Sequence, residues 1–197
     1  MHKLIAILLL VCASAAWAGA QKEEQLSSSV KALMQKSISD DAAPRLVFAS
    51  DADGLVWLTD MSRRLQQKMP DPQLRMDFLR TVNYEASRAG LDPQLVLGLI
   101  QVESGFKKYA VSPVGARGFM QVMPFWVRQI GNPDQDLFHL RLNLRYGCTI
   151  LRHYLDMEKG DLYRALGRYN GSLGQPDYPN MVVGAWRKNW SYRAPSL

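Results

Sequence analysis

The sequence contains few cysteines, and beyond its first twenty residues it has no long apolar run. Of 197 residues only Cys12 and Cys148 are cysteines. Cys12 lies in the apolar N-terminal stretch, so a processed chain would keep Cys148 alone. That excludes an internal disulfide and a cysteine-ligated metal cluster in the processed chain. We expect Cys148 to be a buried thiol.

Runs of like charge are also missing, although the chain is basic. It has 24 lysines and arginines against 18 acids, a formal charge of +6 that falls to +5 without Lys3. This balance favours an anionic partner such as cell-wall polymer, nucleic acid or phospholipid headgroups. The basic residues are scattered through segments that also carry acids, and no strand-borne aromatic motif is present, which disfavours nucleic acid.

The first twenty residues, "MHKLIAILLLVCASAAWAGA", have the pattern of a secretory signal peptide. A positive Lys3 is followed by an apolar stretch and by small residues at Ala16 and Ala18. We expect cleavage near Ala18 or Ala20 and a periplasmic protein; an uncleaved anchor is the alternative. Lipid attachment at Cys12 is disfavoured, because valine precedes it where a lipoprotein signal usually has a small residue.

Helical periodicity dominates the remainder, so we predict a mainly α chain. Residues 21–71 form a helical extension, with apolar residues at helical spacing over 26–38 and again over 55–69, separated by the breaks "SISDDAAP" and "SDADG". Residues 72–197 form the main domain. Its expected helices cover 72–89, 93–104, 119–130, 140–158, 161–169 and 180–190, with a loop or short hairpin over 106–118.

Glu103 stands at the end of the most apolar of these helices, which begins at the capping pair Asp92–Pro93. At about 100° per residue it falls between Val96 and Leu99, so it points inward. Burial disfavours the charged carboxylate and raises its pKa, which suits a general acid. The alternative is a partly exposed glutamate paired with a neighbouring lysine, Lys107 or Lys108.

The stretch "ESGFKKYAVSPVGARGFMQVMP" resembles two signature motifs of the soluble (SLT) type of lytic transglycosylase: glutamate-serine with an A-x-S-x-x-G-A-x-G loop, then G-L-M-Q. Phe119 replaces the leucine. A third motif, A-Y-N, is present as Arg168-Tyr169-Asn170, with arginine in place of alanine. Between them "NLRYGCTILRHYL" is similar to the family helix that carries asparagine and glycine. The resemblance covers about residues 72–190.

The resemblance implies a lysozyme-like fold, mainly α (α+β lysozyme-like), with a small loop or hairpin beside the active-site cleft. It implies cleavage of the β-1,4 bond between N-acetylmuramic acid and N-acetylglucosamine in peptidoglycan, leaving 1,6-anhydromuramic ends without hydrolysis. Glu103 would be the single catalytic acid and then base. No cofactor and no metal are implied, and His139 and His153 are not spaced as a ligand pair.

The resemblance also assigns residues that bind substrate or orient the acid: Ser112, Gln121, Met123, Tyr169 and Asn170. Three of them also fit a purely structural role. Ser112 fits an ordinary Ser-Pro turn, Met123 fits core packing, and Asn170 fits a helix cap before Gly171. The aromatic residues Tyr109, Trp126 and Tyr178 could stack on sugars, but most aromatic residues of a small helical domain belong to the core, so we do not assign these three to the site.

Peptidoglycan strands are therefore the expected partner of a monomer, together with cell-wall or envelope assembly proteins. Two alternatives keep the same fold: a lysozyme-like hydrolase that adds water, and a non-catalytic cell-wall-binding or assembly protein. A membrane-active basic helical protein is a third. An inward acid favours the enzyme, because a pure binding protein has no need of one.

Overall fold

The computed structural model describes residues 21–39 and 42–193, and throughout these residues the regular structure is helical. The predicted signal peptide, 1–20, lies outside the described residues. The elements are α1 (Ser28–Ile38), α2 (Asp51–Leu65), α3 (Pro72–Arg88), α4 (Pro93–Glu103), α5 (Pro124–Ile130), α6 (Leu140–Met157), α7 (Leu162–Asn170), α8 (Asp177–Ala185) and one π-helical turn, η1 (Trp186–Trp190). The mainly α prediction is confirmed. Within the described ranges no helix is long and apolar enough to span a bilayer.

Local sequence signals fix where the central helices begin and end. Asp71 and Asp92 cap α3 and α4 through side-chain oxygens, and a proline follows each of them at the first helical position. α4 ends at Glu103, and the chain turns away through Gly105 with a φ of 56°. A left-handed φ is open to glycine at little cost, which is why the helix stops there.

Three predicted boundaries are wrong, and one of them is the start of the last helix, which lies at Asp177 and not at Asn180. "SDADG" is the start of α2, since Ser50 accepts a hydrogen bond from the Asp53 amide and two aspartates occupy the first turn. α5 begins at Pro124 and not at Phe119, because Arg117 forms single β-bridges with Val111 and Val122. The predicted loop or hairpin is therefore present and extends to Val122.

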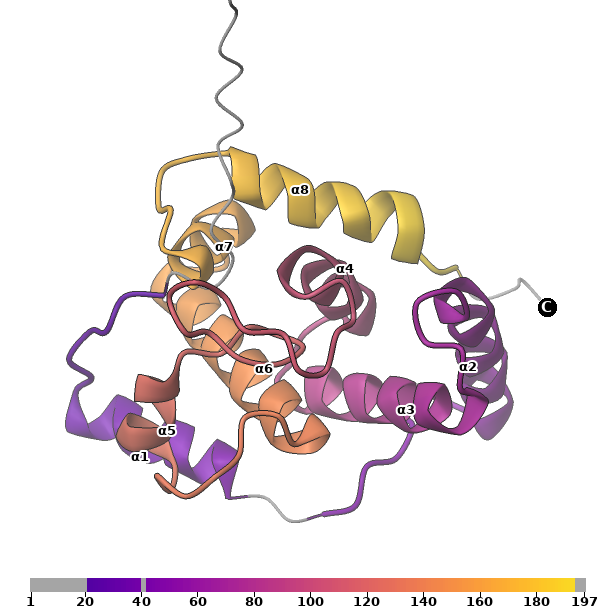
Figure 1. Ribbon diagram of the computed structural model, residues 1–197, viewed down its shortest axis with the longest axis horizontal. Coiled ribbons are helices and arrows are strands. Elements are labelled where there is room, and N and C mark those ends of the chain that lie inside the picture. The colour runs from indigo at the N-terminus through magenta and orange to yellow at the C-terminus, as the bar shows by residue number, and fades with distance from the viewer. Residues whose placement is uncertain (1–20, 40–41, 194–197) are drawn as a thin grey trace, which may run out of the picture.

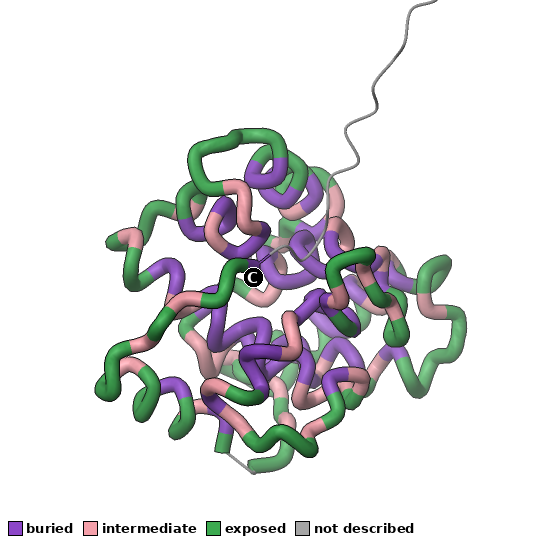
Figure 2. Tube along the Cα trace, turned by 60° about the vertical axis from the view of Figure 1, so that its left-hand side comes forward, coloured by how far each residue is buried: buried purple, intermediate pink, exposed green. Residues whose placement is uncertain are grey.

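Figure 1 shows α4 near the middle of the molecule, with α8 lying across it and α3 and α6 beneath. α8 and η1 pack on α4, α3 packs on α6, and α7 joins α6 to α8. Figure 2 shows buried positions gathered in the interior and exposed ones on the outer turns. α4 is apolar on nearly every side because other elements surround it.

The N-terminal helices contribute to the same core. Met34 and Ile38 of α1 pack against α6, and Leu58 of α2 is fully buried. Leu33 of α1 and Leu74 of α3 lie outside this core, with exposed fractions of 66% and 62%. Cys148 is a free, buried thiol, as predicted.

A buried carboxylate ties α3 to α6. Glu85 is fully buried and pairs with Arg145 of α6 at 3.1 Å and with Arg88 at 3.1 Å. Arg145 also donates to the carbonyl of Ile38 at 3.0 Å, which attaches the end of α1. Because each charge has a partner, the desolvation of the group is compensated.

Close packing of α4 against η1 leads to a stability prediction. A Cβ at Gly98 would lie 2.8 Å from the Trp186 backbone nitrogen, whereas one at Gly184 in α8 would meet nothing within 4 Å. We expect Gly98→Ala to lower the free energy of unfolding by about 1–3 kcal/mol. Gly184→Ala should be neutral or stabilising by up to about 1 kcal/mol. Urea unfolding of both variants measures the difference, and equal midpoints would contradict the packing.

Candidate active site

Glu103 lies inside the molecule at the end of α4, with only 6% of its surface exposed. Its Oε1 atom accepts a hydrogen bond from the Tyr178 hydroxyl of α8. Its Oε2 atom is buried and has no hydrogen-bond partner among the described residues. One carboxyl oxygen is thus held by Tyr178, while the hydrogen-bonding capacity of the other is unused among the described residues.

Burial raises the pKa of Glu103 from 4.5 to about 8, and the Tyr178 hydrogen bond opposes this shift in part. The cause is desolvation, which disfavours the carboxylate more than the neutral acid. A pKa raised to about 8 favours the neutral acid at neutral pH. The alternative of an ion pair with a nearby lysine does not hold for the described residues, where both Lys107 and Lys108 are exposed and neither pairs with Glu103.

The loop that follows Glu103 is attached to α4 and to α6. Ser104 donates to the Phe119 carbonyl at 2.7 Å, which fastens the far side of the loop to the end of α4. Asn143 of α6 accepts from the Met120 amide and donates to the Arg117 carbonyl, both at 2.8 Å. These bonds hold the two ends of the loop next to the acid.

Glycine at position 147 lets α6 approach this loop closely. A Cβ there would lie 2.4 Å from the Met120 sulfur, so Met120 fits against the helix only because Gly147 has no side chain. Asn143 and Gly147 are the asparagine and glycine that the predicted resemblance placed on this helix. Gly147 is explained by its close packing against Met120, and Asn143 is explained by its hydrogen bonds to the loop.

Gln121 is buried and adopts a φ of 49°, which is rare for a residue with a side chain. Its side-chain nitrogen donates to the carbonyls of Ala110 at 3.1 Å and Gly118 at 2.9 Å. Ser112 accepts from the Ala116 amide at 3.1 Å. Both side chains shape the loop, and Ser112 makes no hydrogen bond to Glu103.

Tyr169 lies fully buried in α7, where its hydroxyl donates to the Met120 carbonyl at 2.7 Å. Burial raises the pKa of Tyr169 well above its usual value, and the nearby charge of Glu103 raises it further. Asn170 ends α7 and donates to Ser172 at 3.1 Å, while its Oδ1 atom is buried without a partner. The structure therefore gathers Tyr169 and Glu103 in one region.

Met123 is half-buried at the residue before α5, where it packs on the core while part of it reaches the surface. Packing and groove lining are both compatible with this position.

The partner of the acid is Tyr178, which the sequence motifs do not assign to the site. It is 3% exposed and lies on the same face of α8 as the buried Val182. The i, i+4 spacing of these two residues indicates an inward side chain. Nothing in the sequence indicates which residue it meets, because Glu103 lies 75 positions away.

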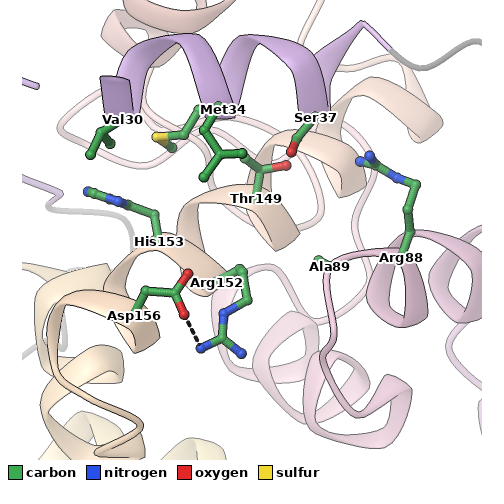
Figure 3. A pocket seen from close by; sticks show the side chains of 10 residues that line it. Val30, Met34, Ser37, Arg88, Ala89, Thr149, Arg152, His153 and Asp156 are labelled. Atoms are coloured by element: carbon green, nitrogen blue, oxygen red, sulfur yellow. Dashed lines mark hydrogen bonds and ion pairs between the residues drawn. The ribbon is translucent and has the colours of Figure 1, made fainter. Parts of the chain in front are cut away.

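A cavity of about 320 Å³ lies elsewhere, between α1, α3 and α6. Figure 3 shows Val30 and Met34 of α1 facing Thr149 and His153 of α6 across it. It contains none of the predicted site residues. Among the residues that the structure describes, no group of three or more His, Cys, Asp or Glu side chains could hold a metal ion.

Comparison with known families adds independent support for the motifs. A family model described as Transglycosylase SLT domain matches residues 80–179, just over half of the chain, and this range contains Glu103, Tyr169 and Tyr178. The chain belongs to the transglycosylase SLT domain family. In this SLT domain the matched residues run from α3 into α8 and include the attached loop.

Three relatives match parts of this chain. A protein named transglycosylase from Enterobacteria phage PRD1 is 32% identical over 108 residues, 52% of this chain and 38% of its own. A Glaesserella parasuis protein named membrane-bound lytic murein transglycosylase C is 35% identical over 113 residues, 49% of this chain and 31% of its own. A protein of that name from Actinobacillus pleuropneumoniae serotype 5b is 49% identical over 47 residues, which are 24% of this chain and 13% of its own. The chain thus spans less than two fifths of each relative.

Proposed function

We propose that this chain is a peptidoglycan lytic transglycosylase that cleaves the N-acetylmuramic acid to N-acetylglucosamine bond and leaves 1,6-anhydromuramic ends. The observation that carries the proposal is the buried Glu103, which has one unpartnered oxygen and whose pKa is raised by burial to about 8. Its place in the SLT domain, and relatives named as murein transglycosylases, support the substrate class.

In the proposed reaction, Glu103 first donates a proton and then accepts a different one. The neutral acid donates its proton to the glycosidic oxygen as the bond to the anomeric carbon breaks. The resulting carboxylate then takes the proton of the C6 hydroxyl as that oxygen attacks the same carbon. The glutamic acid is regenerated, and the atoms balance without water.

Tyr178 acts on this cycle as a positioning residue. Its hydroxyl donates to Oε1, so it stabilises the carboxylate that forms after the first proton transfer and leaves Oε2 to face the reacting oxygen. Gln121, Met123, Tyr169 and Asn170 would line the groove, and Ser112 would support it through the loop.

Product analysis tests the function. Purified sacculi digested by the chain should release muropeptides whose masses are about one water lighter than hydrolytic products. Products with reducing ends would favour a lysozyme-like hydrolase. Binding to sacculi without any release would favour a non-catalytic wall protein. A mature N-terminus after Ala18 or Ala20 would support the proposed leader and periplasmic location.

A Tyr178→Phe variant should shift the pH profile as well as slow the reaction. The Tyr178 hydrogen bond lowers the pKa of Glu103, so its loss should move the alkaline limb of the rate profile upward by about one pH unit. We expect kcat to fall about tenfold. Tyr163→Phe is a matched control, since that exposed hydroxyl meets Asn180. An alkaline limb equal to that of the parent would contradict the role of Tyr178.

A further inference from the structure

The residues that follow the predicted leader form a short extended segment, Gln21–Glu24, which we term the strap. Gln21 is polar, yet only 4% of it is exposed. Its side-chain nitrogen donates to the Gln121 carbonyl at 3.3 Å. Its side-chain oxygen accepts from the Met123 amide at 3.3 Å and from the Trp126 indole at 3.0 Å. The amide of Gln21 is thus satisfied on both sides.

These three partners suit another amide equally well. An acetamido group carries one N–H donor and one carbonyl acceptor, which match the carbonyl of Gln121 and the two N–H groups of Met123 and Trp126. Gln121 and Met123 are residues proposed to line the glycan groove. Gln21 also lies close enough to Tyr169 to influence the pKa of that phenol. The strap therefore occupies the side of the site where an N-acetyl sugar is expected.

Three further contacts fasten the other end of the strap, one of them from the Gln129 side-chain nitrogen to the Glu23 carboxylate at 3.3 Å. Glu24 pairs with Arg168 at 3.3 Å, and its carbonyl accepts from Gln129 at 3.2 Å. Arg168 is the residue that replaces the alanine of the A-Y-N motif. The ion pair is partly exposed, with side chains 23% and 43% accessible, so its contribution is small.

Space for a ligand lies beside the strap. The lining of a cavity of about 280 Å³ includes Glu24, Arg168, Ser172 and Gln175. A glycan that entered here would approach the strap, and the weak ion pair would allow the strap to leave.

We propose that the strap is an autoinhibitory segment. The Gln21 side chain occupies an acetamide-binding site of the glycan groove, and the glycan must displace Gln21 to bind there. This inference rests on the proposed function. Removal of the Gln21 amide should therefore strengthen glycan binding. If the strap were purely structural, the same change would weaken both glycan binding and the stability of the fold.

Binding to the N-acetylglucosamine tetramer tests the strap without turnover. In a Glu103→Gln background, Gln21→Ala should lower the Kd for the tetramer by about threefold or more, as the loss of competing hydrogen bonds predicts. Glu24→Gln should also lower this Kd, and it should disturb the fold less than Gln21→Ala because the Glu24 side chain is partly exposed. Gln25→Ala is the matched control, because Gln25 is exposed. Titration calorimetry gives the Kd, and thermal unfolding confirms the fold.

Hydrogen exchange gives a second readout. Saturating tetramer should speed amide exchange over residues 22–25, whereas an ordinary ligand contact would slow it. Unchanged or weaker binding by both strap variants, or no tetramer binding by any variant, would overturn the proposal. If the chain releases anhydro products from sacculi but Gln21→Ala leaves tetramer binding unchanged, the autoinhibitory role of the strap is overturned and the enzymatic function is not. Tetramer binding strengthened by Gln21→Ala with no product from the parent chain would overturn the enzymatic function alone.

Discussion

A Glu103→Gln variant should lose about 10³-fold or more of the rate at which the parent chain releases anhydromuropeptides from sacculi. Glutamine has nearly the shape of glutamic acid, and its carbonyl oxygen can still accept from Tyr178. Its amide, however, cannot give a proton to the glycosidic oxygen or take one from the C6 hydroxyl. Both proton transfers are lost while the fold is kept.

Asp134→Asn is the matched control for this experiment. Asp134 is exposed, so its neutralisation should leave the release rate unchanged. The control also tests a mechanism with two carboxylates, in which a second acid would be needed within about 10 Å of the first. Full activity of Glu103→Gln, with a circular dichroism spectrum equal to that of the parent, would refute the assignment of Glu103.

Glu103 should also make the stability of the parent chain fall as pH rises. Its pKa is about 8 in the folded chain and near 4.5 when unfolded, so the folded state binds the proton more tightly. The stabilising contribution is fully present below pH 4.5 and is lost as pH rises through 8. The upper limit of the loss is about 5 kcal/mol.

Urea unfolding at pH 5 and pH 9 measures this effect. In Glu103→Gln the side chain no longer titrates, so the fall in the free energy of unfolding between the two pH values should be smaller by several kcal/mol. Other groups titrate in both proteins and cancel in the comparison. Equal pH dependence in the two proteins would show that Glu103 is charged in the folded state at neutral pH.

The helices were largely predictable from the sequence, because their signals are local. Asp92 and Pro93 mark the start of α4, Gly105 marks its end, and the apolar pattern places Glu103 inward. Where local signals compete, the prediction fails. Two aspartates and a glycine after Ser50 resemble a turn, but the same residues make a good first helical turn.

The contacts of the candidate site were much less predictable, since they join distant segments. Tyr178 reaches Glu103 from α8, and Gln21 reaches Trp126 from the opposite end of the chain. The left-handed backbone of Gln121 has no compositional signal, because it is imposed by hydrogen bonds of the loop. Motifs name the residues, whereas tertiary packing decides what they meet.

The central claim is that Glu103 carries a proton inside the protein at neutral pH. Carbon-13 NMR of glutamate labelled at the side-chain carboxyl, with Glu103→Gln used to assign the signal, measures its titration directly. We predict a midpoint near pH 8. A midpoint near 4.5 would contradict the account, because the carboxyl would then have no proton to give at neutral pH.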